Sequence, residues 1–599
     1  MTMKQCLCLA VLCVVTVNAA IRSIQLATDR WCPEIITFIV QLAPTQDPFE
    51  YGERNKIMYI DQVGELEMMF EYKVACSNAT STEEYNRDVD AQEAAWFERH
   101  SVQPGVEEYI EFQRKVAMKP KTIPWHLSGD NAINSLPSHV QQAWNLGFNG
   151  ADVIIGVVDN GFHFDHADIR PGFSTRYSYN YNSGDPDAFW DAPGDTHGTA
   201  CLSIAAAAGR GTSQQCAVGV AKGATSAGIR AIAEDISPAN LARALSHNIR
   251  LTGVMSCSFG LEDDGNSIGG PGTAEMLAID ASQTIGRRGF GTNYYWACGN
   301  GGSIGDRCDF DGFIQQANVN GIGAIDDNGD LSYFSEKCAA LMFVAPSSGG
   351  TRGITAATPL GMSMCTSSFG GTSASAPFEA GVDAVIQSAN PHLNSRDVTD
   401  IQVLSCIKPH PSHGSWITNH VGTRWSEEYG FGLVDLNLAV RLALNSTPGR
   451  LGQQIRSKVA ANTCLVVSTE LGGITQETHI PASRPCPCAI RDTPNAGTTV
   501  QYFVNKRNGR NLVVEFVQVS FSIKHARRSQ LVFRVVSPSG TVIDIPSRAV
   551  DIHADYNWMF KWVGFRGENA TGRWLFSVTD VVSGVSGILT SSSFAFYGH

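Results

Sequence analysis

The middle of the chain alternates short apolar runs with longer segments of helical character. Residues 153–158 and 253–259 are apolar over most of their length, which is typical of strands buried on both faces of a parallel sheet. Residues 274–285 and 373–387 have the composition of helices. Strands and helices that alternate in this way predict an α/β domain with a parallel sheet and helices on both faces. We place this domain at residues 116–447.

The pattern changes at the Pro448-Gly449 pair. Short stretches that alternate apolar and polar residues follow, such as 512–519 and 531–536, and turn-forming residues separate them. Strands of this kind are apolar on one face and pack as two antiparallel sheets. Residues 448–599 are therefore expected to form an all-β, jelly-roll-like sandwich.

The first twenty residues predict a signal peptide. Lys4 precedes an apolar run at residues 6–15, and small residues mark a cleavage point near Ala19 or Ala20. The run is too short to span a membrane, and no later stretch reaches about 18 uninterrupted apolar residues. We expect residues 1–20 to be removed and the mature protein to have no membrane anchor.

The chain carries a formal net charge of −13. An acidic surface is repelled by nucleic acid and by anionic membranes, so neither is expected as a partner. A basic partner or a metal ion suits this charge better. Zinc is not expected, because no cysteines and histidines have the spacing of a zinc finger or of an HExxH site.

Three separated segments contribute an Asp, a His and a Ser. Asp159 follows the first apolar strand, His197 precedes a helix-forming stretch, and Ser373 opens the helix predicted at 373–387. The order Asp, His, Ser along a chain is that of subtilisin-type triads and not that of chymotrypsin or the α/β-hydrolases. The three residues predict acyl transfer, with Ser373 as nucleophile, His197 as general base and Asp159 orienting the histidine.

Each motif alone is more often structural than catalytic. The sequence Gly-Thr-Ser-Ala-Ser-Ala-Pro around Ser373, for example, could be a helix cap of small residues. The common order of the three motifs is hard to explain by packing, and so is the additional segment Trp-Ala-Cys-Gly-Asn-Gly-Gly, which contains Asn300. We therefore interpret the four segments as one catalytic site.

Together the four segments resemble the subtilase superfamily and, within it, the kexin/furin-like proprotein convertases. The shared motifs are His-Gly-Thr-x-Cys, Ala-x-Gly-Asn-Gly-Gly and Gly-Thr-Ser-Ala-x-Ala-Pro. The resemblance implies that Asn300 stabilises the oxyanion together with the backbone N–H of Ser373. Residues 448–599 resemble the convertase P domain, a module that ordinary subtilisins lack.

Residues 21–115 resemble a convertase propeptide and contain no catalytic motif. In that family the segment assists folding, is cut off autocatalytically and inhibits the enzyme. The resemblance therefore implies a small α+β fold that binds the catalytic domain. The pair Arg114-Lys115 is the best local boundary, although the family's usual multibasic run is absent.

The resemblance assigns acidic residues to substrate and metal binding. Asp263 and Asp311 match positions that line the S1 pocket, where they would pair with an Arg or Lys of the substrate. Without the surrounding motifs, the acidic stretch at Asp263 would be interpreted as a surface turn. Calcium is the implied cofactor, because it prefers clustered carboxylate oxygens. The implied ligands are Asp263, Asp306 and Glu336 in a first site, Asp168 in a second, and Asn180, Asp185 and Asp187 in a third.

Several positions depart from the family pattern. Asn160 replaces an acid, and Gly194 stands where an acid of S2 is expected. Leu241 and Gly269 stand where acids of S4 are expected. Each missing carboxylate removes a charge-assisted contact of about 1.5–3 kcal/mol. We therefore expect a requirement for a basic P1 residue and loose selection at P2 and P4.

The sequence has 16 cysteines. Three lie in the predicted signal peptide, so an odd number remains in an oxidising compartment and at least one thiol is expected to be free. Cys201, close to His197 in sequence, is the candidate. Spacing alone does not choose the pairs. The resemblance implies Cys216–Cys365, Cys308–Cys338 and Cys464–Cys488, with Cys486 as a rival of Cys464.

These features predict a serine endopeptidase that acts in the lumen of the secretory pathway, in secretory vesicles or outside the cell. Sequons at Asn78, Asn445 and Asn569 fit that route. The expected substrates are precursor proteins cleaved after Arg or Lys, and the expected state is a monomer. Two alternatives stay open. A broadly specific secreted subtilase is favoured by the missing S2 and S4 acids, whereas a non-catalytic binding or chaperone protein is disfavoured by the complete triad.

Overall fold

The computed structural model divides the chain into two compact units, residues 1–121 and 122–599, each of which is described by itself. The structure describes the backbone of five strands in the first unit. In the second unit it describes residues 124–128, 138–190, 192, 194–209, 216–359, 364–451, 454–460, 463–468, 487–490, 492, 496–506 and 511–599.

The described part of the first unit is a five-stranded sheet in the order β3-β4-β2-β1-β5. β1 pairs in parallel with β2 and antiparallel with β5. β1 lies within the predicted signal peptide, whose removal stays a prediction. Asn78 lies outside the described residues. The strands are β1 (Val11–Val14), β2 (Ile36–Gln41), β3 (Met58–Gln62), β4 (Met69–Val74) and β5 (Tyr109–Phe112).

A seven-stranded sheet forms the centre of the α/β part of the second unit. Its order is β12-β11-β10-β9-β6-β8-β7, and every neighbouring pair runs parallel, as predicted. The strands are β6 (Ile154–Asp159), β7 (Tyr179–Asn180), β8 (Thr225–Arg230), β9 (Val254–Cys257), β10 (Asn293–Ala297), β11 (Val319–Ile325) and β12 (Leu341–Pro346).

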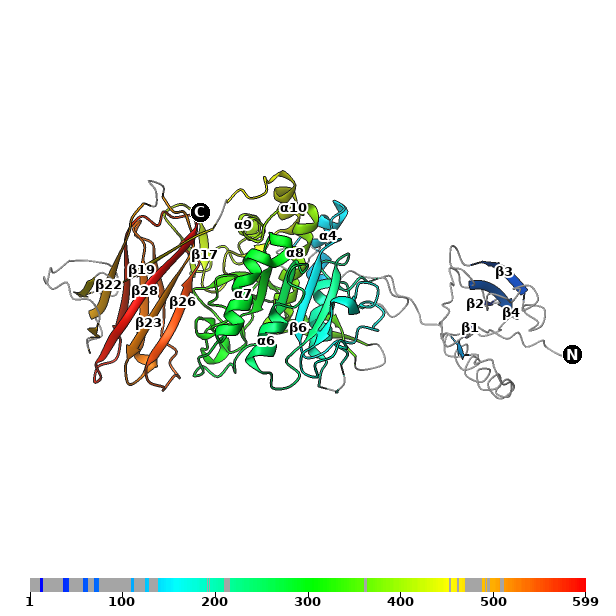
Figure 1. The fold of residues 1–599 in the computed structure, drawn as a ribbon, viewed down its shortest axis with the longest axis horizontal. Coiled ribbons are helices and arrows are strands. Elements are labelled where there is room, and N and C mark those ends of the chain that lie inside the picture. The colour runs from blue at the N-terminus through cyan, green and yellow to red at the C-terminus, as the bar shows by residue number, and fades with distance from the viewer. Residues whose placement is uncertain are drawn as a thin grey trace. The chain divides into compact units, whose positions relative to one another are not determined.

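The central strands are buried on both faces because alternate side chains enter two different cores. From β6, Val157 enters the core beneath α5 and α8, while Val158 enters the core beneath α6 and α7. Figure 1 shows α6 and α7 lying side by side along the sheet. Helices therefore cover both faces, which confirms the predicted layers.

The helices of this part include α8, which packs across five strands of the sheet and carries the predicted nucleophile in its first turn. It spans the segment predicted as a helix at 373–387. Three helices have side-chain N-caps, from Ser237, Asn394 and Asp435. The helices are α3 (Trp125–Ser128), α4 (Val140–Asn145), α5 (His197–Ala206), α6 (Pro238–Leu245), α7 (Thr273–Ile285), α8 (Thr372–Ala389), α9 (Ser395–Ser405) and α10 (Leu436–Asn445).

Short elements lie between the longer ones in the part of the chain that the structure describes. Single turns in the α/β part are η1 (Thr175–Tyr177), η2 (Gly286–Gly289), η3 (Gly302–Ile304) and η4 (Cys308–Phe310), and η5 (Arg528–Gln530) lies in the C-terminal part. Three small antiparallel pairs are β13 (Ile354–Ala357) with β14 (Cys365–Phe369), β15 (Cys406–Ile407) with β18 (Leu433–Val434), and β16 (Trp416–Thr418) with β17 (Arg424–Ser426).

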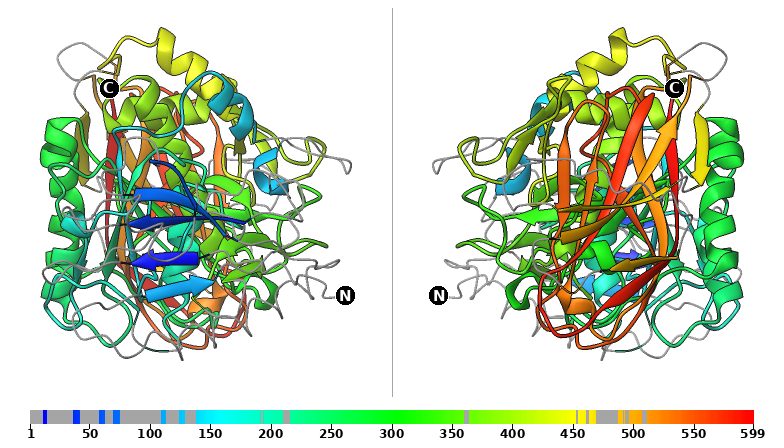
Figure 2. Two further views of the ribbon diagram at one scale, coloured as in Figure 1. Left: turned by 90° about the vertical axis from the view of Figure 1, so that its right-hand side faces the viewer. Right: turned by 90° about the vertical axis from the view of Figure 1, so that its left-hand side faces the viewer.

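The C-terminal part is the predicted sandwich of two antiparallel sheets, and it faces the viewer in the right-hand view of Figure 2. One sheet has the order β19-β28-β23-β26 with β21 also paired to β28, and the other has the order β20-β22-β27-β24-β25. The strands are β19 (Ile455–Ala460), β20 (Thr463–Ser468), β21 (Cys488–Ile490), β22 (Ala496–Val504), β23 (Val514–Lys524), β24 (Leu531–Val536), β25 (Val542–Ile545), β26 (Tyr556–Trp562), β27 (Gly572–Asp580) and β28 (Gly587–Gly598).

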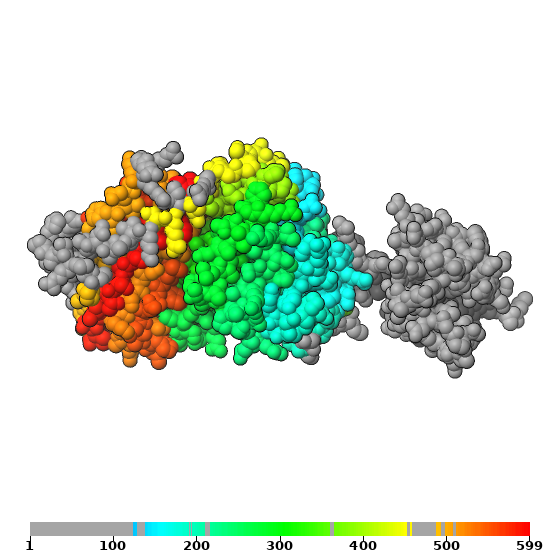
Figure 3. Space-filling model, in the orientation of Figure 1, coloured from blue at the N-terminus to red at the C-terminus, as the bar shows by residue number. Residues whose placement is uncertain are grey.

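Aromatic side chains fill the space between the two sheets. Phe521 of β23 lies 5.0 Å from Phe533 of β24 and 5.2 Å from Phe560 of β26, measured between ring centroids. The sandwich also packs directly against the α/β part, and the two share a continuous border in Figure 3. Across that border Gln518 Nε2 donates to the Gln315 carbonyl oxygen at 2.8 Å.

Candidate active site

Asp159 is the last residue of β6, where the strand ends at the carboxyl edge of the parallel sheet. Its side chain is fully buried. Oδ1 accepts the backbone N–H of Asn160 at 2.8 Å, so part of the carboxylate charge is balanced by the chain itself. This is the edge at which open α/β sheets place their ligands and reacting groups.

His197 is the first residue of α5, and its Nδ1 lies 2.8 Å from Asp159 Oδ1 and 3.0 Å from Oδ2. The close approach depends on Gly198, because a Cβ there would lie 2.6 Å from the Gly161 carbonyl oxygen and 2.9 Å from Asp159 Cβ. Burial disfavours the charged imidazole, but the Asp159 carboxylate outweighs this effect and raises the pKa of His197 well above its usual range. Asp159 therefore orients the ring and stabilises its protonated form.

Ser373 is the second residue of α8 and is half-buried. The turn before it places Gly371 at φ 72°, a left-handed conformation that favours glycine. The Ser373 carbonyl oxygen accepts from Ser258 Oγ at 3.3 Å. Within the described residues no hydrogen bond joins Ser373 Oγ to the His197 ring. Enzymes without substrate commonly have such a loose serine–histidine contact, which tightens when substrate binds.

Asn300 follows the carboxyl end of β10 and is exposed. Its side-chain Oδ1 accepts the Thr372 backbone N–H at 2.9 Å and the Thr372 hydroxyl at 3.1 Å. Because Thr372 holds the oxygen of the amide, the Nδ2 group stays free to donate to an oxyanion next to Ser373. The sequence motifs did not single out Thr372 for this orienting role.

Cys201 lies one turn along α5 from His197, with Sγ 3.6 Å from His197 Nδ1. Its thiol is free and fully buried, which confirms the expectation of a free cysteine beside the histidine. Burial raises the pKa of the Cys201 thiol, so the sulfur is neutral at physiological pH. Cys257, Cys298 and Cys406 are also free among the described residues.

Five acidic side chains line one cavity at the carboxyl edge of the sheet: Glu262 and the four predicted for S1 or the first calcium site. The predicted four come from separate segments of the chain: Asp263 from the loop after β9, Asp306 and Asp311 from either side of η4, and Glu336 from the loop before β12. The carboxylates expected in S1 and in the first calcium site therefore share one cavity. Asp306 and Glu336 are buried, with 7% and 4% of their surface exposed.

Burial and mutual repulsion make it costly to charge this cluster. Burial, assisted by the charges of Asp263 and Asp306, raises the pKa of Asp311 to about 7. Burial and the same two carboxylates raise the pKa of Glu336 well above its usual range. A cation would relieve this repulsion, so the donors fit both a basic substrate side chain and a calcium ion.

The cavity is connected to the catalytic residues through the backbone. Asn300 donates its N–H to Asp263 Oδ2 at 2.9 Å, and the next residue, Gly301, donates to Glu336 Oε1 at 3.0 Å. Neighbouring Asp264 caps its own turn through the Asn266 N–H at 2.7 Å and the Ser267 hydroxyl at 3.0 Å. The acidic stretch is therefore a turn, and its members Glu262 and Asp263 line the cavity.

Asp168, predicted for a second calcium site, is fully buried. Oδ2 accepts the N–H groups of Cys216 and Ala217 at 2.8 and 2.9 Å, whereas Oδ1 has no hydrogen-bond partner among the described residues. An unpartnered buried carboxylate oxygen suits a cation. The remaining positions of that site, including Ser213, depart from the family pattern, and Ser213 lies outside the described residues.

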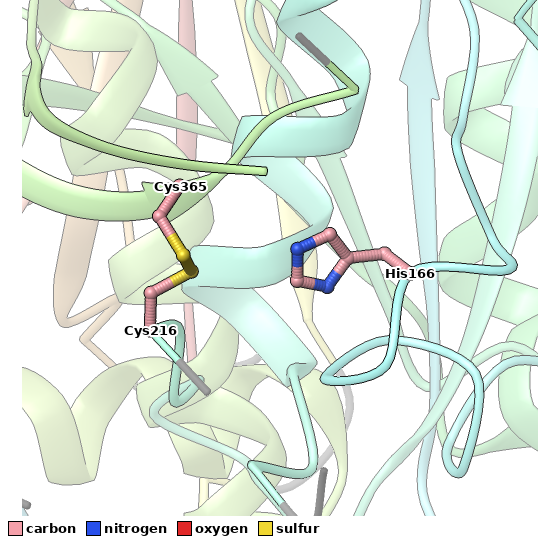
Figure 4. Close-up of side chains that lie close together, drawn as sticks. All are labelled: His166, Cys216 and Cys365. Carbon is pink, nitrogen blue, oxygen red and sulfur yellow. A yellow bond between two sulfur atoms is a disulfide. The ribbon is translucent and has the colours of Figure 1, made fainter. Parts of the chain in front are cut away.

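His166 packs beside Asp168 and the Cys216–Cys365 disulfide, with its ring directed at the sulfur atoms (Figure 4). Its Nε2 bonds to the Met364 carbonyl oxygen at 2.8 Å, and its Nδ1 accepts the Asp168 N–H at 3.1 Å. Both nitrogens are used, so the histidine fixes the start of β14, the strand that leads to Ser373.

The residues predicted for the third calcium site shape a loop. Asn180 Oδ1 accepts the N–H of Asn182 at 3.0 Å, Asp185 Oδ1 accepts that of Asp187 at 2.8 Å, and Asp187 Oδ1 accepts that of Phe189 at 2.9 Å. One oxygen of each side chain is therefore engaged with the backbone. A calcium site there stays a prediction.

An ion pair that the sequence did not indicate occupies the region expected for S2. Arg230, at the end of β8, donates from Nη2 to Asp195 Oδ2 at 2.7 Å and from Nε to the Asn160 carbonyl oxygen at 2.8 Å. Both side chains are buried. Asp195, the acid next to Gly194, therefore already has a cationic partner.

The disulfides Cys216–Cys365 and Cys308–Cys338 are present, as expected from the resemblance. Cys488 is also disulfide-bonded, but the side chains of Cys464 and Cys486 lie outside the described residues, so its partner stays a prediction. Asn445 is exposed at the end of α10, and Asn569 is half-buried. Among the described helices none is long and apolar enough to cross a membrane.

Comparison with protein families supports this architecture. Residues 150–432 match the subtilase family, and residues 514–596 match the proprotein convertase P-domain. The first range contains the triad, Asn300 and the four acidic residues. The second range contains most of the sandwich.

Curated proteins named as proprotein convertases or furins are similar to the chain over most of its length. The chain is 30% identical over 466 residues to rat proprotein convertase subtilisin/kexin type 6, covering 77% of this chain and 47% of that protein. It is 31% identical over 456 residues to Drosophila melanogaster furin-like protease 1, isoform 1-CRR, and the match covers 75% of this chain and 38% of that protein. It is 29% identical over 483 residues to human furin, and the match covers 79% of this chain and 57% of that protein. The chain thus spans between about a third and 60% of the length of the curated relatives it matches.

Among solved structures, a serine protease of Aeromonas sobria superposes with a TM-score of 0.67 and 20% sequence identity, covering 79% of this chain and 94% of that one. At that identity the likeness concerns the fold. The two family matches therefore identify a subtilase domain at residues 150–432 and a proprotein convertase P domain that follows it.

Proposed function

We propose that this protein is a serine endopeptidase of the secretory pathway that cleaves precursor proteins after Arg or Lys. The observation that carries the proposal is the hydrogen bond between the Asn300 N–H and Asp263 Oδ2, at 2.9 Å. It joins an oxyanion-binding amide to an acidic cavity suited to a basic side chain. The convertase relatives support the same substrate class.

In the proposed mechanism Ser373 Oγ attacks the scissile carbonyl carbon while His197 Nε2 takes the hydroxyl proton. Asp159 holds the Nδ1 side of the ring and stabilises the imidazolium that forms. The Nδ2 group of Asn300 and the Ser373 N–H bind the oxyanion. His197 then passes the proton to the leaving amine, and water hydrolyses the acyl-enzyme by the same route in reverse.

The P1 side chain is the part of the substrate that the acidic cavity recognises. A guanidinium presents donors in a planar fork, so it can satisfy Asp263 and Asp311 at once, whereas an ammonium offers a single point of charge. We therefore expect Arg to be preferred to Lys. The Arg230–Asp195 ion pair offers no free acid to a P2 side chain, which supports loose selection at P2.

Asp263, Asp306 and Glu336 would hold a calcium ion, whose charge would offset the repulsion among the buried carboxylates. Asp168 would contribute to a second ion through its unpartnered Oδ1. Both ions would have a structural role at the walls of the site, because none of these residues contacts the triad.

The proposal extends to the processing of the chain. Residues 1–20 would be a signal peptide, 21–115 an inhibitory propeptide, 116–447 the catalytic domain and 448–599 the P domain. The mature product would be a monomer in the lumen of the secretory pathway, in vesicles or outside the cell.

The test is a peptide library that varies P4 to P1, incubated with the purified mature protein in the presence of calcium. The expected profile shows strong selection for Arg at P1, weak selection at P2 and P4, and loss of cleavage when calcium is chelated. Ser373→Ala is the control and should cleave nothing. Indifference to the P1 residue would instead identify a broadly specific subtilase.

A further inference from the structure

One side chain of the P domain reaches the acidic cavity of the subtilase domain. Arg548 lies in the loop between β25 and β26 and lines the cavity together with Asp263, Asp306 and Asp311. Only 1% of its side chain is exposed. A buried arginine is costly unless its charge and its N–H groups are satisfied, so its partners define what it does.

The guanidinium of Arg548 bonds to two segments of the subtilase domain. Nη1 donates to Asp306 Oδ1 at 3.1 Å and to the Ser267 carbonyl oxygen at 2.8 Å. Nη2 donates to the Asn266 carbonyl oxygen at 3.0 Å. The guanidinium of Arg548 therefore connects the turn that follows Asp263 with the segment that carries Asp306.

A second P-domain residue fixes the position of the Arg548 guanidinium. Nη2 of Arg548 also donates to Asp551 Oδ2 at 2.7 Å, and Asp551 is fully buried in the same loop. A lysine could not reproduce these contacts. Its three N–H donors are on a single nitrogen atom, so they cannot reach carbonyl and carboxylate groups spread along one plane, as the guanidinium does.

Arg548 also packs on the residue beside Asp311. Its guanidinium carbon lies 4.1 Å from the centroid of the Phe310 ring. That ring is 5.5 Å from the P-domain ring of Phe560 and 6.1 Å from that of Tyr556. The backbone that presents Asp311 is therefore fixed by contacts with the P domain.

We propose that Arg548 is a positioning residue for the acidic pocket, through which the P domain takes part in recognising the P1 side chain. The inference rests on the proposed function. Arg548 holds the walls that present Asp263, Asp306 and Asp311, so undocking it would move the carboxylates apart and weaken binding of a basic side chain. It does not contact the reacting groups.

The experiment compares Arg548→Met and Arg548→Lys with the wild type, all as mature full-length proteins. The matched control is Arg566→Met, because Arg566 is also a buried P-domain arginine that pairs with the subtilase domain, through Asp400 at 3.1 Å, but it lies outside the acidic cavity. Unfolding temperatures report any general loss of docking.

Three readouts separate positioning from stability. The first is the dissociation constant of p-aminobenzamidine, a fluorescent amidinium probe that needs no catalysis. The second is the split between KM and kcat for a peptide with Arg at P1. The third is the rate at which a fluorophosphonate labels Ser373, which reports the triad without using the pocket.

For Arg548→Met we expect the dissociation constant of the probe and the KM to rise about tenfold, while kcat and labelling stay within about threefold. Arg548→Lys keeps the charge but loses the planar guanidinium, so the dissociation constant of the probe and the KM should each rise about threefold. Arg566→Met should lower the unfolding temperature without changing either constant. If Arg548→Met does not fold, Arg548→Lys decides the question.

Unchanged or tighter probe binding in the Arg548 variants would overturn the proposal, since it would mean that Arg548 merely reduces the negative charge of the pocket. Equally weakened probe binding in Arg566→Met would also overturn the proposal. It would mean that any loss of contact between the P domain and the subtilase domain weakens the pocket, whichever arginine is changed. A wild type that binds no amidinium would refute the basic-P1 function itself, and the inference would fail with it.

Discussion

Asn300 donates its backbone N–H to Oδ2 of Asp263 at 2.9 Å. The carboxylate expected to recognise the P1 side chain thus also positions the residue whose amide is expected to bind the oxyanion. We therefore expect P1 binding in the pocket to be coupled to stabilisation of the transition state. No such bond links Asn300 to Asp311, whose Oδ1 accepts the Phe313 N–H at 2.8 Å.

This difference makes the two acids separable by mutation. Asp263→Asn should raise the KM for a P1-Arg peptide and also lower kcat, because the amide can turn its nitrogen toward the Asn300 N–H. Asp311→Asn should raise KM by about tenfold with kcat nearly unchanged, since it removes one charge-assisted contact. Steady-state kinetics on one peptide check both. Equal losses of kcat in the two variants would contradict the connection.

The oxyanion role of Asn300 predicts a selective loss of kcat. Asn300→Ala should lower kcat by about 10²–10³ with little change in KM, because the missing bond forms only in the transition state. Thr372→Val is the matched variant: it removes the hydroxyl that holds Oδ1 but keeps the backbone N–H, so a loss of about tenfold or less is expected. A larger loss in Thr372→Val than in Asn300→Ala would refute the assignment.

The Asp159–His197 contact predicts a pH effect. Hydrolysis needs neutral His197, and Asp159 raises the pKa of the imidazole, so activity of the wild type should rise with pH through a pKa above 6.5. In Asp159→Asn the stabilising charge is absent, and the rising limb should move to lower pH while kcat falls by about 10⁴. The profile of kcat/KM against pH checks both effects. A limb that stays in place would show that Asp159 does not face the ring in the active enzyme.

The sequence motifs located the triad and Asn300 because each motif is local and its residue stands at the end of a strand or at the start of a helix. The four acids were assigned from the family resemblance, and the structure brings them to one cavity. Arg548 could not be predicted in this way. Its partner Asp306 is 242 residues away, and nothing in the loop around Arg548 differs from an ordinary charged surface loop.

Two other features were not predicted from the sequence, for related reasons. The Arg230–Asp195 pair depends on how the end of β8 meets the loop before α5, which no local pattern encodes. The buried acids of α8 were also missed, because acidic residues in a helix are ordinarily exposed to solvent and no local pattern marks these as buried. Glu379 and Asp383 are both fully buried in it.

Glu379 predicts that folding stability depends on pH. Burial raises its pKa to about 8, Gln402 Nε2 donates to Oε1 at 2.9 Å, and Oε2 has no partner among the described residues. Between pH 4.5 and about 8 the folded state therefore holds a proton that the unfolded state has lost, so stability should fall as pH rises across this window.

Glu379→Gln should remove this contribution, which amounts to about 1.4 kcal/mol per pH unit for one proton. The measurement is the free energy of unfolding at several pH values for both proteins. Glu234→Gln, at an exposed position outside the acidic cavity, is the control and should keep the slope of the wild type. If Glu379→Gln kept that slope as well, Glu379 would be ionised in the folded state.

The most direct test of the whole account uses two peptides that differ only in having Arg or norleucine at P1, cleaved by the purified wild type in calcium. Two carboxylate contacts to the P1 guanidinium predict that kcat/KM favours the Arg peptide by at least about 100-fold and that Ser373→Ala cleaves neither. Equal rates on the two peptides, or cleavage by Ser373→Ala, would contradict it.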